Sequence, residues 1–112
     1  MIIDFQNDFT PGGALGVAGG DEIAGRINEL AADDRFDLVV ATRDWHPQDH
    51  GSFTEQGGIW PVHCVQGTPG AELFAGLDQA VEKAITQSAQ VLMIRHHDDL
   101  AMHGGIGAVL RF

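Results

Sequence analysis

The sequence predicts an α/β fold built around a parallel β-sheet. Three observations predict it: an apolar segment at residues 1–4, an amphipathic stretch after Asp21, and a second apolar run at residues 35–42. Strand, helix and strand in this order form a crossover unit, and such crossovers make the two strands parallel. Ligands of open parallel sheets bind beyond the carboxyl ends of the strands, so a functional site is expected at that edge.

Each element of the first part has a local signal. Residues 1–4 are three apolar residues that stop at Asp4, which is typical of the end of a buried strand. Residues 10–21 contain a proline and five glycines, which predicts a loop. Asp21 is expected to be the N-cap of the helix that follows. The apolar residues of that helix recur at helical spacing: Ile23, Ile27 and Leu30.

The second part of the chain begins with the run at residues 35–42, whose continuous apolar core predicts a strand buried on both faces. Residues 43–70 form a turn-rich connection with three of the four prolines. A loop of this length in a small domain is usually functional or disordered. Residues 71–89 have a helix-like pattern, and residues 90–94 are expected to form a third strand.

Composition limits the functions to consider. At 112 residues and 44% hydrophobic content, the chain is one domain at most, with a modest core. A formal charge of −10 argues against nucleic acid or an anionic membrane surface as a partner. We expect no signal peptide and no membrane-spanning segment. The single cysteine suits a reducing compartment, so a cytoplasmic protein is expected.

A candidate metal site follows the second strand. Asp44 and His46 are spaced so that both side chains can point to the same side of an extended segment, and His63 is a third candidate ligand from a separate segment. One oxygen and two nitrogens suit Zn²⁺, Mn²⁺ or Fe²⁺ rather than Ca²⁺. The alternative is an exposed acid and two histidines with ordinary hydrogen bonds. His50 is either a fourth ligand or part of a turn, and we favour the turn.

Other residues near the same edge invite a catalytic interpretation. Asp4 lies in an apolar strand context, where a carboxylate is either a general base or a cap for loop amides. Phe9 and Trp60 are either the walls of a flat aromatic slot or part of a small satellite core. Cys64 follows His63 directly, but we expect it to be a buried small hydrophobe and not a nucleophile.

Three segments, IDFQNDFTPGGALGVAGGD, LVVATRDWHPQDHGSF and WPVHCVQGTPGAEL, closely resemble the nicotinamidases of the isochorismatase-like cysteine hydrolase superfamily. The resemblance implies a Rossmann-like three-layer α/β sandwich with a parallel sheet. It also implies hydrolysis of nicotinamide to nicotinate and ammonia in NAD salvage, by an Asp–Lys–Cys triad beside a divalent metal ion. By motif, Asp4 would be the triad aspartate. The metal ligands would be Asp44, His46 and His63, and the pyridine ring would lie between Phe9 and Trp60.

The chain departs from the family beyond residue 77. Lys83 is the only lysine and lies in the helix-like stretch, so we do not assign it to the triad. The nucleophilic cysteine belongs to a later segment and is not identifiable here. We therefore expect a single domain over residues 1–112 that is incomplete at its C-terminus. It is family-like over residues 1–77, with an unassigned tail over residues 78–112.

The expected function is that of a nicotinamidase with impaired activity. We expect nicotinamide as its small-molecule partner, and assembly into a homo-oligomer in addition to the monomer. Two alternatives stay open. One is a related amidase that acts on another small aromatic amide. The other is a non-catalytic remnant that binds metal.

Overall fold

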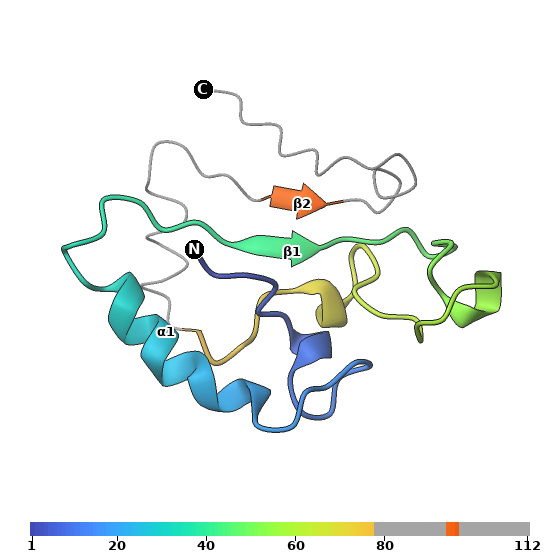
Figure 1. The fold of residues 1–112 in the computed structure, drawn as a ribbon, viewed down its shortest axis with the longest axis horizontal. Coiled ribbons are helices and arrows are strands. Elements are labelled where there is room, and N and C mark those ends of the chain that lie inside the picture. Colours follow the sequence, from blue (N-terminus) through green and yellow to red (C-terminus); the bar gives the residue numbers. More distant parts are fainter. Residues whose placement is uncertain (78–93, 97–112) are drawn as a thin grey trace.

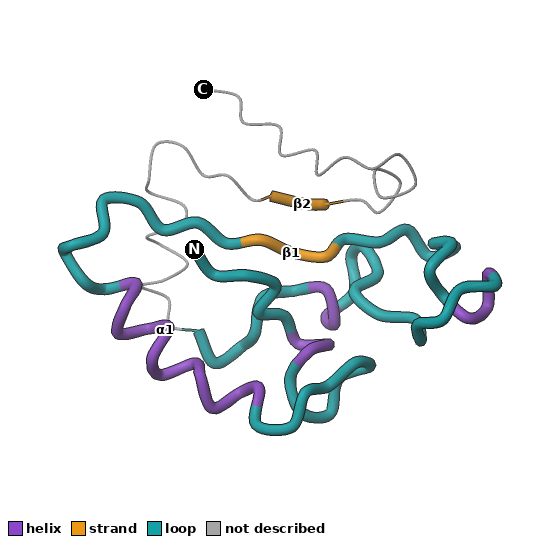
Figure 2. Tube along the Cα trace, viewed as in Figure 1, coloured by secondary structure: helices purple, strands orange, loops and turns teal. Residues whose placement is uncertain are grey.

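Helices and parallel strands follow one another along the chain in the computed structural model, which describes residues 1–77 and 94–96 (Figure 1). Helix α1 is Ala24–Ala31, strand β1 is Thr42–Asp44 and strand β2 is Ile94–His96. Most of the remaining described chain is loop interrupted by single 3-10 turns (Figure 2). Within the described ranges, no helix has the length and apolar character needed to cross a bilayer.

The described strands are parallel, as the crossover pattern predicts. The N-terminal segment runs beside the chain that leads into β1, with a parallel bridge between Ile2 and Ala41. The backbone N–H of Thr42 donates to the carbonyl of Ile2 at 2.9 Å. Strand β2 pairs with β1 in parallel (Figure 1). In the register of this pair, Asp44 lies opposite His96. The carboxyl ends of these strands therefore meet at one edge.

The prediction of a strand over residues 35–42 is wrong in its extent. Only Ala41 and Thr42 of that run take part in β-pairing, and β1 continues to Asp44. Burial on both faces also fails, because Phe36 and Leu38 are each about half exposed, at 52% and 50%. The physical reason is that no described strand pairs with residues 36–39, so their apolar side chains lie along a groove instead of inside a sheet.

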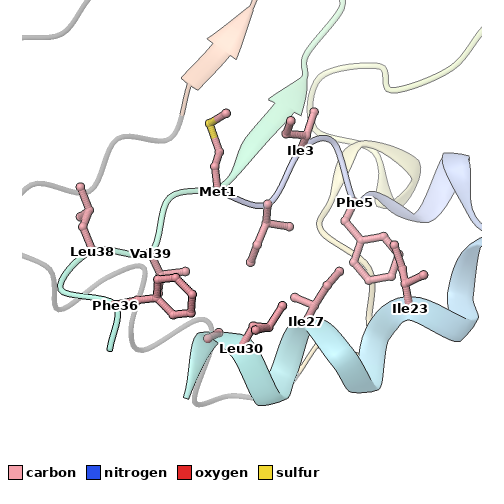
Figure 3. A pocket seen from close by; sticks show the side chains of 11 residues that line it. Met1, Ile3, Phe5, Ile23, Ile27, Leu30, Phe36, Leu38 and Val39 are labelled. Atoms are coloured by element: carbon pink, nitrogen blue, oxygen red, sulfur yellow. The ribbon is translucent and has the colours of Figure 1, made fainter. Parts of the chain in front are cut away.

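That groove lies between α1 and the N-terminal segment and has a volume of about 360 Å³. Ile27 and Leu30 point from α1 toward the N-terminal segment, which confirms the amphipathic pattern of the helix (Figure 3). The buried core beside the groove is small and consists of Phe5, Ala41 and Leu77. The packing of α1 against this core adds to the backbone pairing of Ile2 with Ala41 in keeping the N-terminal segment beside the chain that leads into β1.

Two helix predictions are corrected. Asp21 is not the N-cap, because the chain enters α1 through a 3-10 turn at Gly20–Ile23, and Ile23 then occupies the cap position without a side-chain hydrogen bond. The helix predicted at residues 71–89 is absent over residues 71–77, where Leu73 instead forms an antiparallel bridge with Gln6. That bridge supplies backbone hydrogen bonds outside a helix. Residues 78–93 lie outside the described part, and so does most of the predicted third strand.

Candidate metal centre

The carboxyl end of β1 brings together the three predicted ligands. Asp44 is the last residue of β1, and His46 follows two residues later. The backbone N–H of His46 donates to the carbonyl of Cys64 at 2.9 Å, and His46 bridges Val65 in parallel. This pairing places His63 directly beside the Asp44–His46 segment, although nearly twenty positions separate them in the sequence.

The ligand atoms of the three side chains form one cluster. One atom each from Asp44, His46 and His63 lie within 4.8 Å of one another. Oδ2 of Asp44 is 3.5 Å from Nε2 of His46 and 3.8 Å from Nε2 of His63. Ligands of a tetrahedral zinc ion, each about 2.0–2.2 Å from the metal, lie roughly 3.3–3.6 Å apart. The cluster is therefore close to the spacing that a divalent ion requires.

The orientation of His63 is set by its second ring nitrogen. Nδ1 of His63 lies 2.7 Å from the carbonyl oxygen of Pro61. A carbonyl can only accept, so Nδ1 carries a proton, and in the neutral ring this leaves the lone pair on Nε2, on the side of Asp44. Metal-binding histidines usually have such a second partner, which fixes the tautomer and the ring plane. The donor set thus fits a divalent cation in chemistry as well as in spacing.

A buried phenylalanine supports the imidazole rings. Phe53 is fully buried, and its ring meets those of His46 and His63 edge-on, at centroid distances of 5.6 and 5.4 Å. His50 stacks on His46 at 4.4 Å. Nδ1 of His50 is bonded to the Ser52 hydroxyl at 2.7 Å, and the described cluster does not include His50. The turn interpretation of His50 therefore agrees with its contacts.

The cluster opens into a cavity of about 340 Å³. Phe9 and Trp60 line the cavity together with the three ligands, and the Phe9 ring lies 5.9 Å from that of His63. Trp60 is about half exposed and is not part of the buried core. Both aromatic residues predicted for a slot thus line the same cavity as the three candidate ligands.

Asp4 lies at the same edge, held by Thr42. The Thr42 hydroxyl donates to Oδ1 of Asp4 at 2.6 Å and accepts from the backbone N–H of Asp4 at 3.1 Å. Asp4 has a φ of 48°, a left-handed conformation that is uncommon outside glycine. The bonds with Thr42 stabilise this conformation, which ends the N-terminal segment.

Cys64 is fully buried, as expected, and its backbone is left-handed rather than extended. Its φ is 47°, so the chain turns sharply just after His63. The pKa of the Cys64 thiol is raised to about 12, first by burial and then, in decreasing order, by the carboxylates of Asp44, Asp8 and Asp4. The thiol is neutral at physiological pH, which is the opposite of an activated nucleophile.

The raised pKa of Cys64 predicts two measurable effects. A thiol reagent at about pH 8 should modify the folded chain far more slowly than the unfolded chain, because only the thiolate reacts.

The free energy of unfolding should be unaffected by the Cys64 thiol below pH 9.0 and should fall as the pH rises from there to about 12. In that window the unfolded chain releases the thiol proton and the folded chain retains it.

Cys64→Ala is the control for the alkaline effect. The chain has no tyrosine and one lysine, so few other groups titrate in that window. Urea unfolding at several alkaline pH values should show a shallower loss of stability for the variant. An identical pH dependence in both proteins would contradict the assignment to Cys64.

Sequence reasoning missed two polar residues of the N-terminal loop. Gln6 is fully buried, and Asp8 is half-buried beside Cys64. Their side chains bond to backbone groups of the segments that carry the ligands, and backbone groups leave no mark in a sequence. The available signal was a glutamine and an acid placed between apolar residues next to the predicted site.

The fold and the site together define an α/β domain with a candidate metal-ligand cluster at the carboxyl edge of its parallel strands, an arrangement that suits metal-assisted hydrolysis. The chain belongs to the isochorismatase domain family, which matches residues 1–91.

Curated relatives and solved structures of known function are similar to this chain. It is 44% identical over 94 residues to a nicotinamidase of Acinetobacter baylyi, covering 70% of this chain and 43% of that protein. It is 44% identical over 89 residues to a nicotinamidase/pyrazinamidase of Mycobacterium tuberculosis, covering 76% and 48%. The chain thus spans somewhat less than half the length of these relatives.

Two crystal structures share the fold. The pyrazinamidase of Pyrococcus horikoshii in complex with zinc is 52% identical, with a TM-score of 0.64, and the match covers 70% of this chain and 45% of that one. A protein of L. infantum in complex with nicotinate is 51% identical, with a TM-score of 0.66, covering 70% and 40%. The resemblance read from the three sequence segments is therefore confirmed.

Proposed function

We propose that this site is the metal and substrate centre of a nicotinamidase, an amidohydrolase that converts nicotinamide to nicotinate and ammonia. One observation carries the proposal: the cluster of Asp44, His46 and His63 opens into a cavity that Phe9 and Trp60 also line. A flat aromatic amide has the shape for such a cavity. The zinc and nicotinate bound by the two similar crystal structures support the same reading.

Within this proposal the described residues have separate roles. Asp44, His46 and His63 would hold a divalent ion (Zn²⁺, Mn²⁺ or Fe²⁺), which supplies a Lewis acid for a ring nitrogen or a water. Phe9 and Trp60 would flank the pyridine ring. Asp4, oriented by its bond from Thr42, would be the general base that receives the proton of the nucleophile.

The same proposal gives this chain little or no amidase activity of its own. An acyl-enzyme reaction needs an activated nucleophile. Cys64 is the only cysteine, and its pKa is raised to about 12. It is also bound through its backbone N–H to Asp8 and fully buried. The second candidate function, a metal- and ligand-binding remnant without turnover, rests on these properties of Cys64.

The wider expectations belong to the same proposal. The sheet would lie within a three-layer sandwich, and residues 1–112 would form one domain, family-like over residues 1–77. The protein would be cytoplasmic and would bind nicotinamide as its small-molecule partner. It would also assemble into a homo-oligomer. A related amidase specific for another small aromatic amide is the alternative within the enzyme class.

Binding and turnover can be tested separately. Purified chain loaded with Zn²⁺ or Mn²⁺ should show saturable quenching of tryptophan fluorescence by nicotinamide, and Trp60→Phe should remove it. Trp45 remains in that variant as the internal control, since it packs against Arg43 and does not line the cavity. A panel of nicotinamide, pyrazinamide and benzamide would show whether the ring nitrogen matters.

Ammonia release from nicotinamide should be at background. Turnover of nicotinamide that is lost in Asp4→Ala would contradict the expected lack of activity. It would show that this chain is itself an active amidase. Absence of ring binding in metal-loaded protein would sink the assignment to nicotinamide.

A further inference from the structure

Polar side chains of the N-terminal loop reach across the molecule to the two segments that carry the metal ligands. The loop follows Asp4 and includes the 3-10 turn Asn7–Phe9. Its side chains do not join the ligand cluster within the described residues. Two of them, Gln6 and Asp8, form hydrogen bonds with backbone groups that lie 38 to 65 positions away in the sequence.

Gln6 holds the backbone of Asp44 at both ends. The N–H of Asp44 donates to Oε1 of Gln6 at 2.8 Å, and Nε2 of Gln6 donates to the carbonyl of Asp44 at 2.9 Å. The second hydrogen of Nε2 goes to the carbonyl of Ala71 at 2.7 Å. Because Gln6 is fully buried, no water replaces these bonds. The side chain thus pairs with Asp44 as a neighbouring strand would.

Asp8 holds the segment after His63. Its Oδ2 accepts the backbone N–H of Cys64 at 2.7 Å, and its Oδ1 accepts that of Ala14 at 3.3 Å. The first bond falls on a residue with a φ of 47°, a conformation that needs outside support. A carboxylate on a backbone N–H forms one of the stronger hydrogen bonds. Asp8 therefore sets the direction in which the chain leaves His63.

Gly70 packs directly against the Asp8 carboxylate. A Cβ added at Gly70 would overlap the carboxylate carbon and both of its oxygens. Gly70 belongs to the short turn Pro69–Ala71, which Gln6 also reaches through Ala71. The turn thus contacts both loop side chains. A methyl group at Gly70 would displace the carboxylate without changing Asp8 itself.

We infer that Gln6 and Asp8 are positioning residues of the metal centre, Gln6 for Asp44 and Asp8 for His63. The inference rests on the proposed function, because it takes the cluster to be a metal site. Neither side chain touches the cation. Each fixes the backbone of one ligand segment, so that the carboxylate and the imidazole nitrogens face one another before the ion binds. Outer partners of this kind typically contribute 10- to 100-fold to metal affinity.

The test measures the affinity and the absorption spectrum of bound Co²⁺ in the full chain, so it does not depend on amidase activity. Asp8→Ala and Gln6→Met should each weaken Co²⁺ binding by roughly 10- to 100-fold and change the visible spectrum. Asp8→Asn keeps one acceptor oxygen and should restore part of the affinity. Gly70→Ala should resemble Asp8→Ala.

Three control variants separate positioning from general stability. Asp34→Ala removes an exposed acid, and Gly25→Ala adds a methyl group with nothing within 4 Å. Both should leave Co²⁺ affinity and spectrum unchanged. Ile27→Ala should lower the stability of the apolar core and still bind Co²⁺ with the wild-type spectrum, because Ile27 packs beside the core and does not line the metal-site cavity.

The outcomes are distinct. Wild-type affinity and spectrum in Asp8→Ala, Gln6→Met and Gly70→Ala would overturn the inference and leave the metal centre standing. An equal loss in Ile27→Ala would also overturn it, because the effect would then be one of stability. Failure of the wild-type chain to bind Co²⁺ would refute the proposed metal centre and the inference together.

Discussion

Replacing His63 with alanine is expected to lower the affinity of the chain for Zn²⁺ by more than about 100-fold. In the proposed centre His63 would supply one of three ligand atoms, and its loss should exceed the roughly 10- to 100-fold effect of outer partners. Asp44→Asn should act similarly, since it removes the negative charge that faces both imidazole rings. Isothermal titration of Zn²⁺ and Mn²⁺ into metal-stripped protein measures both effects.

His50→Asn is the matched control for this prediction. It also removes an imidazole within the same loop. The asparagine side chain can still accept the hydrogen bond that the backbone N–H of Ser52 donates to His50. We expect its affinity to stay within a few-fold of the wild type. A loss as large as that of His63→Ala would mean that His50 is a fourth ligand and that the turn interpretation is wrong.

Phe53→Ala is expected to cost about 3–5 kcal/mol of stability, the usual range for removing a fully buried phenylalanine. The ring has no solvent exposure and contacts the rings of His46, His50 and His63. Small domains have only about 5–15 kcal/mol of stability in total, so the variant should be close to unfolding. Urea denaturation followed by circular dichroism measures the change.

Phe36→Ala provides the comparison for Phe53→Ala. The same atoms are removed, but Phe36 is 52% exposed along the apolar groove. Its replacement should cost well under half as much. Equal losses at the two positions would mean that the packing around the histidines does not stabilise the fold. Added Zn²⁺ should also partly restore the midpoint of Phe53→Ala, because a ligand that binds only the folded state stabilises it.

Local patterns were sufficient where a feature depends on neighbouring residues. The helix at Ala24–Ala31 follows from apolar residues at helical spacing, and the parallel strands follow from the crossover order. The spacing of Asp44 and His46 also placed both side chains correctly, because an extended segment repeats every two residues. These are short-range consequences of backbone geometry.

Local patterns failed where a distant segment decides the structure. The apolar run at residues 35–42 predicts a buried strand, but the run itself does not determine whether a neighbouring strand pairs with it. Residues 71–77 have helical spacing, yet Leu73 pairs with Gln6. Tertiary hydrogen bonds override helix propensity there, since propensity is worth well under about 1 kcal/mol per residue.

The sequence by itself determined the family, the three candidate metal ligands, the two aromatic residues and the buried state of Cys64. Only the tertiary structure decided that these ligands meet, and which side chains hold them. Gln6, Asp8 and Phe53 act through backbone amides, carbonyls and ring edges of remote segments. Every residue except proline presents the same backbone groups, so such partners become identifiable only when the folded chain brings them within bonding distance.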